Sequence, residues 1–168
     1  MMKSFALAAV TLLLAAPVHA VTAPTLKLAS LKDLPVVETH PYDEHADANA
    51  AVAAAFAKAR VSHKRVLIDL GGNWCGDCLV LANLMQLPEL KRFLKAHYEI
   101  VSVDVGRFTR NLQIPARYGI TTRLEGVPAF LVVTTEGKLV NTGRVSAIQD
   151  ARHMTPQALA DWLAQWTN

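Results

Sequence analysis

Cysteine is scarce in this chain of 168 residues, which contains only Cys75 and Cys78. A disulfide between such near neighbours closes a very short loop, so it restrains the unfolded chain less than a long-range bridge would. The sequence therefore excludes a small scaffold held together by several disulfides. A purely structural role explains the pair poorly, and its spacing points to chemistry at the two sulfur atoms.

A strong excess of charge of one sign is also absent. The chain has 17 Lys and Arg against 14 Asp and Glu, a formal net charge of +3 with histidine neutral. The basic residues are scattered except for Arg60, His63, Lys64 and Arg65, which we interpret as the solvated end of a helix. So mild an excess predicts no nucleic-acid partner.

The six histidines lack the spacing of a metal site. None lies at a separation from the cysteine pair that defines a tetrahedral zinc site, so we predict no bound metal and no organic cofactor. The alternative is a binding module without redox turnover. In that module the cysteines would hold a partner, or would hold copper or zinc together with His40 or His45.

No hydrophobic run is long enough to cross a membrane. The run from Phe5 to Ala16 is shorter than the roughly 20 residues of a transmembrane helix. It follows Lys3 and leads to small residues at Ala20, which is the pattern of a cleaved signal peptide. We predict that residues 1–20 are removed and that the protein is periplasmic or secreted. An uncleaved anchor is the alternative.

One globular domain is expected at residues 43–168, because 52% of the chain is hydrophobic. Residues 21–42 contain scattered prolines and no sustained period, and they read as an extended arm or linker. Helices are predicted at 43–60, 75–85, from 88 onward, at 112–118 and after 155, with Asp47 and Thr155 as caps. Strands are predicted at 66–70, 98–105, 129–135 and 138–141, the last two as a hairpin.

The two cysteines occupy the turn between a predicted strand and a predicted helix. Cys75 would lie at the helix N-terminus, where free N–H groups and partial positive charge lower a thiol pKa. Cys75 is therefore the candidate nucleophile. Cys78, one turn later on the same face, is placed to attack the mixed disulfide that Cys75 forms with a substrate.

Three motifs follow one another along the chain: Val66-Leu67-Ile68-Asp69, then Trp74-Cys75-Gly76-Asp77-Cys78, then Gly126-Val127-Pro128. In this order they resemble the thioredoxin-like superfamily, over roughly residues 45–168. The resemblance implies an α/β thioredoxin-like fold, a central mixed sheet flanked by helices, here with an N-terminal extension. It also implies a thiol–disulfide oxidoreductase that acts on protein or small-molecule thiols and disulfides.

The resemblance assigns roles on the substrate side of the site. It implies that Pro128 is cis and faces the cysteine pair, so that the backbone of Val127 binds an extended substrate. An ordinary proline at the start of a strand is the alternative. Trp74 would shape the surface beside Cys75, or would merely pack over the turn.

Asp69 is an ionisable residue in an apolar strand, six positions before Cys75. Burial should raise its pKa, which suits proton exchange with Cys78, and the resemblance implies the same role. The alternative is a structural aspartate at the end of the strand, bonded to backbone donors.

The sequence departs from the thioredoxin pattern in ways that affect substrate choice and direction. Residues 121–125 lengthen a loop beside the site, and the lysine that many thioredoxins pair with the buried aspartate has no counterpart. Between the cysteines lie Gly76 and Asp77, which tune the site, and Asp77 stands where a proline is common. Its charge would oppose a Cys75 thiolate and favour a reductant supplied by a membrane-delivered electron donor, unless Asp77 points into solvent.

Overall fold

The computed structural model describes residues 21–167, and the predicted signal peptide lies outside the described residues. Its centre is a three-stranded sheet in the order β2-β1-β3. β1 is Arg65–Gly71, β2 is Tyr98–Asp104 and β3 is Ala129–Val133. β2 runs parallel to β1, and β3 runs antiparallel to it. The sheet is therefore mixed, as expected. β1 is its central strand, paired on both edges and buried on both faces, and such a strand is mostly apolar.

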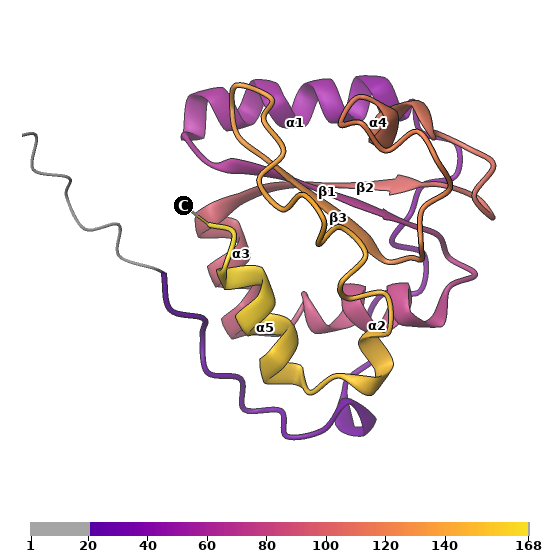
Figure 1. The fold of residues 1–168 in the computed structure, drawn as a ribbon. Helices are drawn as coiled ribbons and strands as arrows, with labels where there is room; N and C mark the ends of the chain where they lie inside the picture. The colour runs from indigo at the N-terminus through magenta and orange to yellow at the C-terminus, as the bar shows by residue number, and fades with distance from the viewer. Residues whose placement is uncertain (1–20, 168) are drawn as a thin grey trace, which may run out of the picture.

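Helices cover both faces of the sheet (Figure 1). α1 (Ala48–Ser62) and the short α4 (Gln113–Ala116) lie on one face; α2 (Gly76–Leu84), α3 (Pro88–His97) and α5 (Pro156–Ala164) lie on the other. Single 3-10 turns, η1 (Leu31–Asp33) and η2 (Ala151–His153), precede α1 and α5. No helix among the described residues is both long and apolar enough to span a membrane.

Local signals set the helix boundaries. The Asp47 carboxylate accepts hydrogen bonds from the N–H groups of Asn49 and Ala50, and the Thr155 hydroxyl accepts one from Ala158. Both predicted caps are therefore confirmed, since they satisfy N–H groups that a helix leaves free. Pro88 begins α3, as predicted, because a proline at the first helical position has no N–H to leave unpaired.

The predicted strand at 138–141 is wrong beyond its first residues. The chain turns back after β3, but only an isolated antiparallel bridge forms, between Val133 and Leu139. Farther on, the Asn141 side chain replaces the backbone: its Oδ1 accepts from Val132 N at 3.0 Å, and its Nδ2 donates to Phe130 O at 2.7 Å. A buried side-chain amide thus satisfies the edge of β3 that a fourth strand would have covered.

The segment 21–42 is extended, and it runs along the domain beneath α5 and α2 (Figure 1). Leu26 is buried in the core, and its N–H donates to Gln157 of α5 at 3.0 Å. Farther along, the N–H groups of Val37 and Glu38 donate to Asn83 Oδ1 of α2 at 2.6 and 2.9 Å. Contacts at several points therefore hold this arm against the helices.

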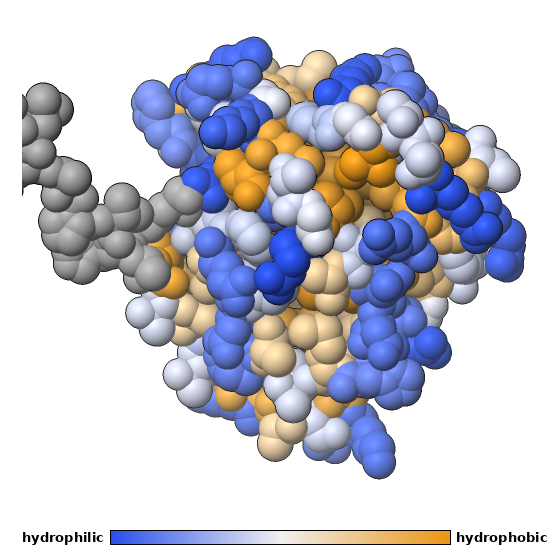
Figure 2. All heavy atoms as spheres, in the orientation of Figure 1, coloured by the Kyte–Doolittle hydropathy of each residue, from blue (hydrophilic) through white to orange (hydrophobic). Residues whose placement is uncertain are grey.

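Two apolar cores lie on opposite sides of the sheet. One is formed with α1 and includes Cys75 and Cys78, and the other is formed with α3 and α5. Figure 2 shows hydrophobic residues reaching the surface below α1, where the chain after β3 crosses the sheet, while hydrophilic residues gather on the flanks. The disulfide thus sits at the edge of a packed core, which fixes the elements around it.

Candidate functional site

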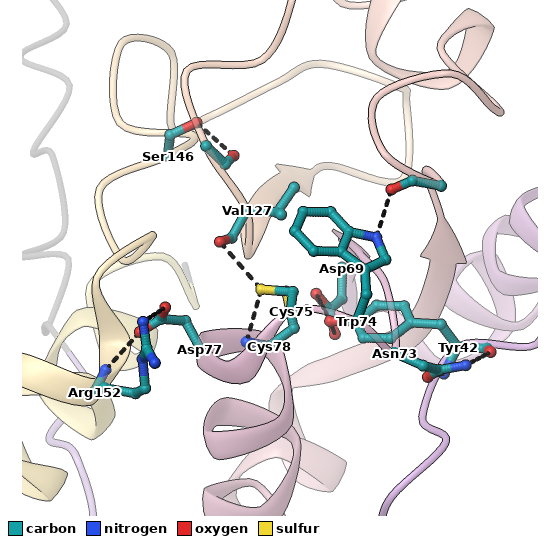
Figure 3. Close-up of a disulfide and its surroundings, with 12 residues drawn as sticks. Tyr42, Asp69, Asn73, Trp74, Cys75, Asp77, Cys78, Val127, Ser146 and Arg152 are labelled. Atoms are coloured by element: carbon teal, nitrogen blue, oxygen red, sulfur yellow. Dashed lines mark hydrogen bonds and ion pairs between the residues drawn. A yellow bond between two sulfur atoms is a disulfide. The ribbon is translucent and has the colours of Figure 1, made fainter.

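The cysteine pair lies where β1 ends and α2 begins, as predicted (Figure 3). The turn between them is tight: Cys75 N donates to Gly72 O at 3.0 Å, and the Trp74 indole donates to Gly106 O at 2.7 Å. A side chain at Gly72 would collide with the Trp74 ring. Glycine at this position therefore allows Trp74 to fold over the turn.

Cys75 and Cys78 form a disulfide with a Cα–Cα distance of 5.2 Å. Cys75 is the N-cap residue of α2, and its Sγ accepts a hydrogen bond from Cys78 N at 3.1 Å. Cys75 is 6% exposed and Cys78 is 0% exposed, so a substrate reaches the sulfur of Cys75 first. An N–H donor and a helix N-terminus at that sulfur both stabilise a thiolate there once the disulfide is reduced.

The segment before β3 faces the disulfide. The Val127–Pro128 peptide bond is cis, as the resemblance implied, and Val127 O lies 3.4 Å from Cys75 Sγ. Behind it, the Ser146 hydroxyl donates to Gly126 O at 3.3 Å, and a side chain at Gly126 would collide with Gln149. The backbone of Val127 is thus held directly beside the sulfur that meets substrate.

Asp69 is buried behind the pair, on the central strand between Ser102 of β2 and Phe130 of β3. Burial raises the pKa of its carboxyl group from 3.8 to about 7, because the charged form loses its hydration. Among residues 21–167, no backbone N–H donates to this carboxylate. Instead, the Tyr42 hydroxyl donates to both carboxylate oxygens, at 2.9 and 3.0 Å, and lowers the pKa of Asp69.

Tyr42 is a residue of this site that the sequence did not reveal. It belongs to the arm and lies 27 positions before its partner Asp69. No local pattern links the two, because their contact depends on how the arm crosses the domain. The one available signal was the missing lysine, which left a buried aspartate without an evident partner.

Asp77 corrects one expectation. It neither stands alone nor points into solvent: its carboxylate accepts from Arg152 N at 2.9 Å and pairs with the Arg152 guanidinium at 3.0 Å (Figure 3). η2 packs against α2 and brings Arg152 to this position, and Gly76 leaves room for it. The negative charge that would oppose a Cys75 thiolate is therefore largely offset by Arg152.

The surface next to Cys75 is aromatic and basic. Trp74 is 40% exposed, and it meets Phe108 edge to face at a ring distance of 6.0 Å. Arg107 stacks over Trp74 at 4.8 Å, and Arg123 of the longer loop stacks over Phe108 at 4.4 Å. Residues 121–125 thus contribute to the surface near the disulfide, together with the exposed part of Trp74.

Metal ligands do not gather at the site. Within residues 21–167, the His, Cys, Asp and Glu side chains form no group of three that could hold a metal ion. His40 and His45 lie with Tyr42 and Asn73 around a shallow pocket of the arm.

This chain is similar to a known protein family and to several solved structures. A family model described as thioredoxin-like matches residues 47–135. The disulphide isomerase from Xylella fastidiosa Temecula1 is 37% identical and has a TM-score of 0.72, over 77% of this chain and 98% of that one. The oxidised DsbD C-terminal domain of Neisseria meningitidis is 26% identical with a TM-score of 0.43, over 56% and 80%. No curated protein matches. The central mixed sheet, the Cys75–Cys78 disulfide at the start of α2 and the family match together establish that this chain belongs to the thioredoxin-like family.

Proposed function

We propose that this protein is an exported thiol–disulfide oxidoreductase that works as a reductant of protein or small-molecule disulfides. One observation carries the proposal: Cys75 caps α2, is the more accessible sulfur of a disulfide, and lies against the backbone of Val127. This arrangement gives a nucleophile and a place for an extended substrate on the same side of the site. The identity of the Xylella relative as a disulphide isomerase supports the same class of chemistry.

The reaction proceeds through two exchanges of thiol and disulfide. The Cys75 thiolate attacks one sulfur of the substrate disulfide, which releases a substrate thiolate and forms a mixed disulfide. Cys78 then loses its proton to Asp69 and attacks Cys75, which forms the internal disulfide and releases the second substrate thiolate. Two electrons pass from the protein to the substrate. An acceptor whose pKa is about 7 suits this proton transfer near neutral pH.

The proposed direction now depends on Asp69 more than on Asp77, whose charge is paired with Arg152. The partner of Asp69 is the neutral Tyr42 hydroxyl, so the ionised carboxylate keeps its negative charge close to the cysteines. A nearby negative charge disfavours the thiolate and so favours the disulfide, which lowers the reduction potential. A reductant in an oxidising compartment needs a continuous supply of electrons, which we assign to a membrane-delivered donor.

Redox titration against glutathione tests the direction. We expect a reduction potential near the thioredoxin value of about −270 mV. A potential above about −180 mV would instead make the protein an oxidant or an isomerase. The Xylella relative is described as a disulphide isomerase. Insulin reduction tests turnover itself, because a module that only binds a metal or partner leaves the rate at that of the thiol reagent alone.

Export is proposed from the N-terminal pattern, with cleavage between Ala20 and Val21. The mass and N-terminal sequence of protein recovered from outside the cytoplasm check this prediction. A Lys3→Glu variant serves as a matched test, because reversal of the charge before the hydrophobic run should slow export. A mature chain that still begins at Met1 would contradict both the cleavage and the assignment of an oxidising compartment.

A further inference from the structure

Tyr42 lies outside the residues that match the thioredoxin-like family model, which begins at residue 47. It is nevertheless one of the most buried side chains, with 1% of its surface exposed. Its backbone is tied to the turn before the disulfide: Tyr42 N donates to Asn73 Oδ1 at 3.1 Å, and Asn73 Nδ2 donates back to Tyr42 O at 2.8 Å. The arm is thus fixed to the loop that carries Trp74 and Cys75.

We propose that Tyr42 is a positioning residue of the redox site: its hydroxyl orients Asp69 for proton exchange with Cys78. The inference rests on the proposed function, since it names what controls the proton step of that reaction. In the view of Figure 3 the Asp69 carboxylate lies between the disulfide and the Tyr42 ring. The arm therefore completes the site from the side opposite to the substrate.

The geometry leaves Tyr42 little freedom. A side chain at Gly71, two residues after Asp69, would collide with the Tyr42 ring, so the ring packs directly against the backbone of β1. The hydroxyl reaches both oxygens of Asp69, which fixes the rotation of the carboxylate. A buried carboxylate without a donor is strongly disfavoured, and a hydroxyl stabilises its charged form without cancelling the charge. A lysine would cancel it.

Asp69 also borders a cavity of about 410 Å³ between the arm, α2, α3 and β2. The charged or titratable groups that line this cavity are Glu38 of the arm, Lys91 and Lys95 of α3, and Tyr98 of β2. On the other side Asp69 faces the disulfide at the start of α2, and β3 carries no titratable residue. The cavity gives Asp69 a route to pass the proton of Cys78 on to solvent.

The step itself is a proton transfer followed by an exchange of disulfides. The Cys78 thiol gives its proton to the Asp69 carboxylate, and the resulting thiolate attacks Cys75. The bond between Cys75 and the substrate sulfur breaks, the electron pair leaves with the substrate thiolate, and Asp69 later returns its proton to solvent. The Tyr42 hydroxyl donates to Asp69 and to neither sulfur, and it sets the pH at which Asp69 can accept the proton.

The test compares Tyr42→Phe with Tyr98→Phe, which removes another buried tyrosine hydroxyl. The Tyr98 hydroxyl donates to Leu163 O at 2.7 Å, near the C-terminal end of α5, and makes no hydrogen bond to Asp69 or to either cysteine. Carbon-13 NMR of the aspartate side chains in the oxidised protein follows the titration of Asp69 directly. We expect Tyr42→Phe to raise the midpoint of the Asp69 titration by about one pH unit, because a hydrogen bond that lowers the pKa of Asp69 is lost. Tyr98→Phe should leave this midpoint unchanged.

The rate at which a Cys75–glutathione mixed disulfide resolves, followed by acid quench and mass spectrometry, gives the functional readout. On the acid side of the profile Tyr42→Phe should slow resolution up to about tenfold, and the difference should vanish at alkaline pH. Gly71→Ala, which displaces the Tyr42 ring, should act in the same direction.

Two results would overturn the proposal. The first is an Asp69 titration and a rate profile that are unchanged in both Tyr42→Phe and Gly71→Ala. The second is an equally large effect of Tyr42→Phe in an Asp69→Asn background, because the effect would then not pass through Asp69. Failure of the proposed function would be distinct: the wild-type protein would then form no mixed disulfide at all.

Discussion

Cys75→Ser is expected to abolish disulfide reduction, whereas Cys78→Ser is expected to turn the protein into a covalent trap. Cys75 is the accessible sulfur at the N-cap of α2, so its loss removes the only nucleophile that a substrate reaches. Insulin reduction should fall by at least about three orders of magnitude. Cys78→Ser removes only the second exchange, so mixed disulfides with substrates accumulate and are seen on non-reducing gels.

The proteins that Cys78→Ser traps would identify the physiological substrates. The double variant Cys75→Ser/Cys78→Ser is the control, since it keeps the surface around Trp74 and Arg107 but forms no covalent adduct. Alkylation of the reduced wild-type protein tests the roles independently, and Cys75 should react first. If Cys78 reacts faster, or if Cys75→Ser is the variant that accumulates adducts, the two roles are reversed.

The parts of the fold that the sequence predicts well are those set by neighbours in sequence. Asp47, Thr155 and Pro88 each act on N–H groups within a few residues, so their roles can be read without knowledge of the fold. The same is true of Cys75, because the strand before it and the helix after it lie in one continuous segment. The cysteine site was therefore predicted in outline.

The parts of the structure that cannot be predicted from the sequence depend on contacts between distant segments. Arg152 reaches Asp77 across 75 positions, and it reverses the expectation that Asp77 is an unpaired charge. Tyr42 reaches Asp69 in the same way, from a segment that reads as an arm or linker. The hairpin ends at Asn141, where the side chain rather than the backbone bonds to β3. Composition and period carry no information about such pairs.

Asp69→Asn is expected to stabilise the oxidised protein, and to do so more strongly as the pH rises. Burial raises the pKa of Asp69 from 3.8 to about 7 in the folded protein. The folded state therefore binds more protons than the unfolded state between these values, so its stability falls as the pH rises from about 4 to about 7. Above the pKa of Asp69 in the folded protein, the full loss of stability is about 4 kcal/mol, at 1.36 kcal/mol for each unit by which the pKa is raised. Asparagine does not titrate, so the variant does not suffer this loss.

Urea unfolding of both proteins at about pH 4 and about pH 8 measures the effect, because other groups titrate alike in both and cancel in the difference. The difference in free energy of unfolding should be small at the lower pH and several kcal/mol at the higher one. Asp33→Asn, at an exposed aspartate of η1, is the matched control and should show no such trend. An equal difference at both pH values would mean that Asp69 titrates near its ordinary range. Asp69 would then be a much weaker base at neutral pH, and the proton transfer from Cys78 that the proposed mechanism requires would be far less favourable.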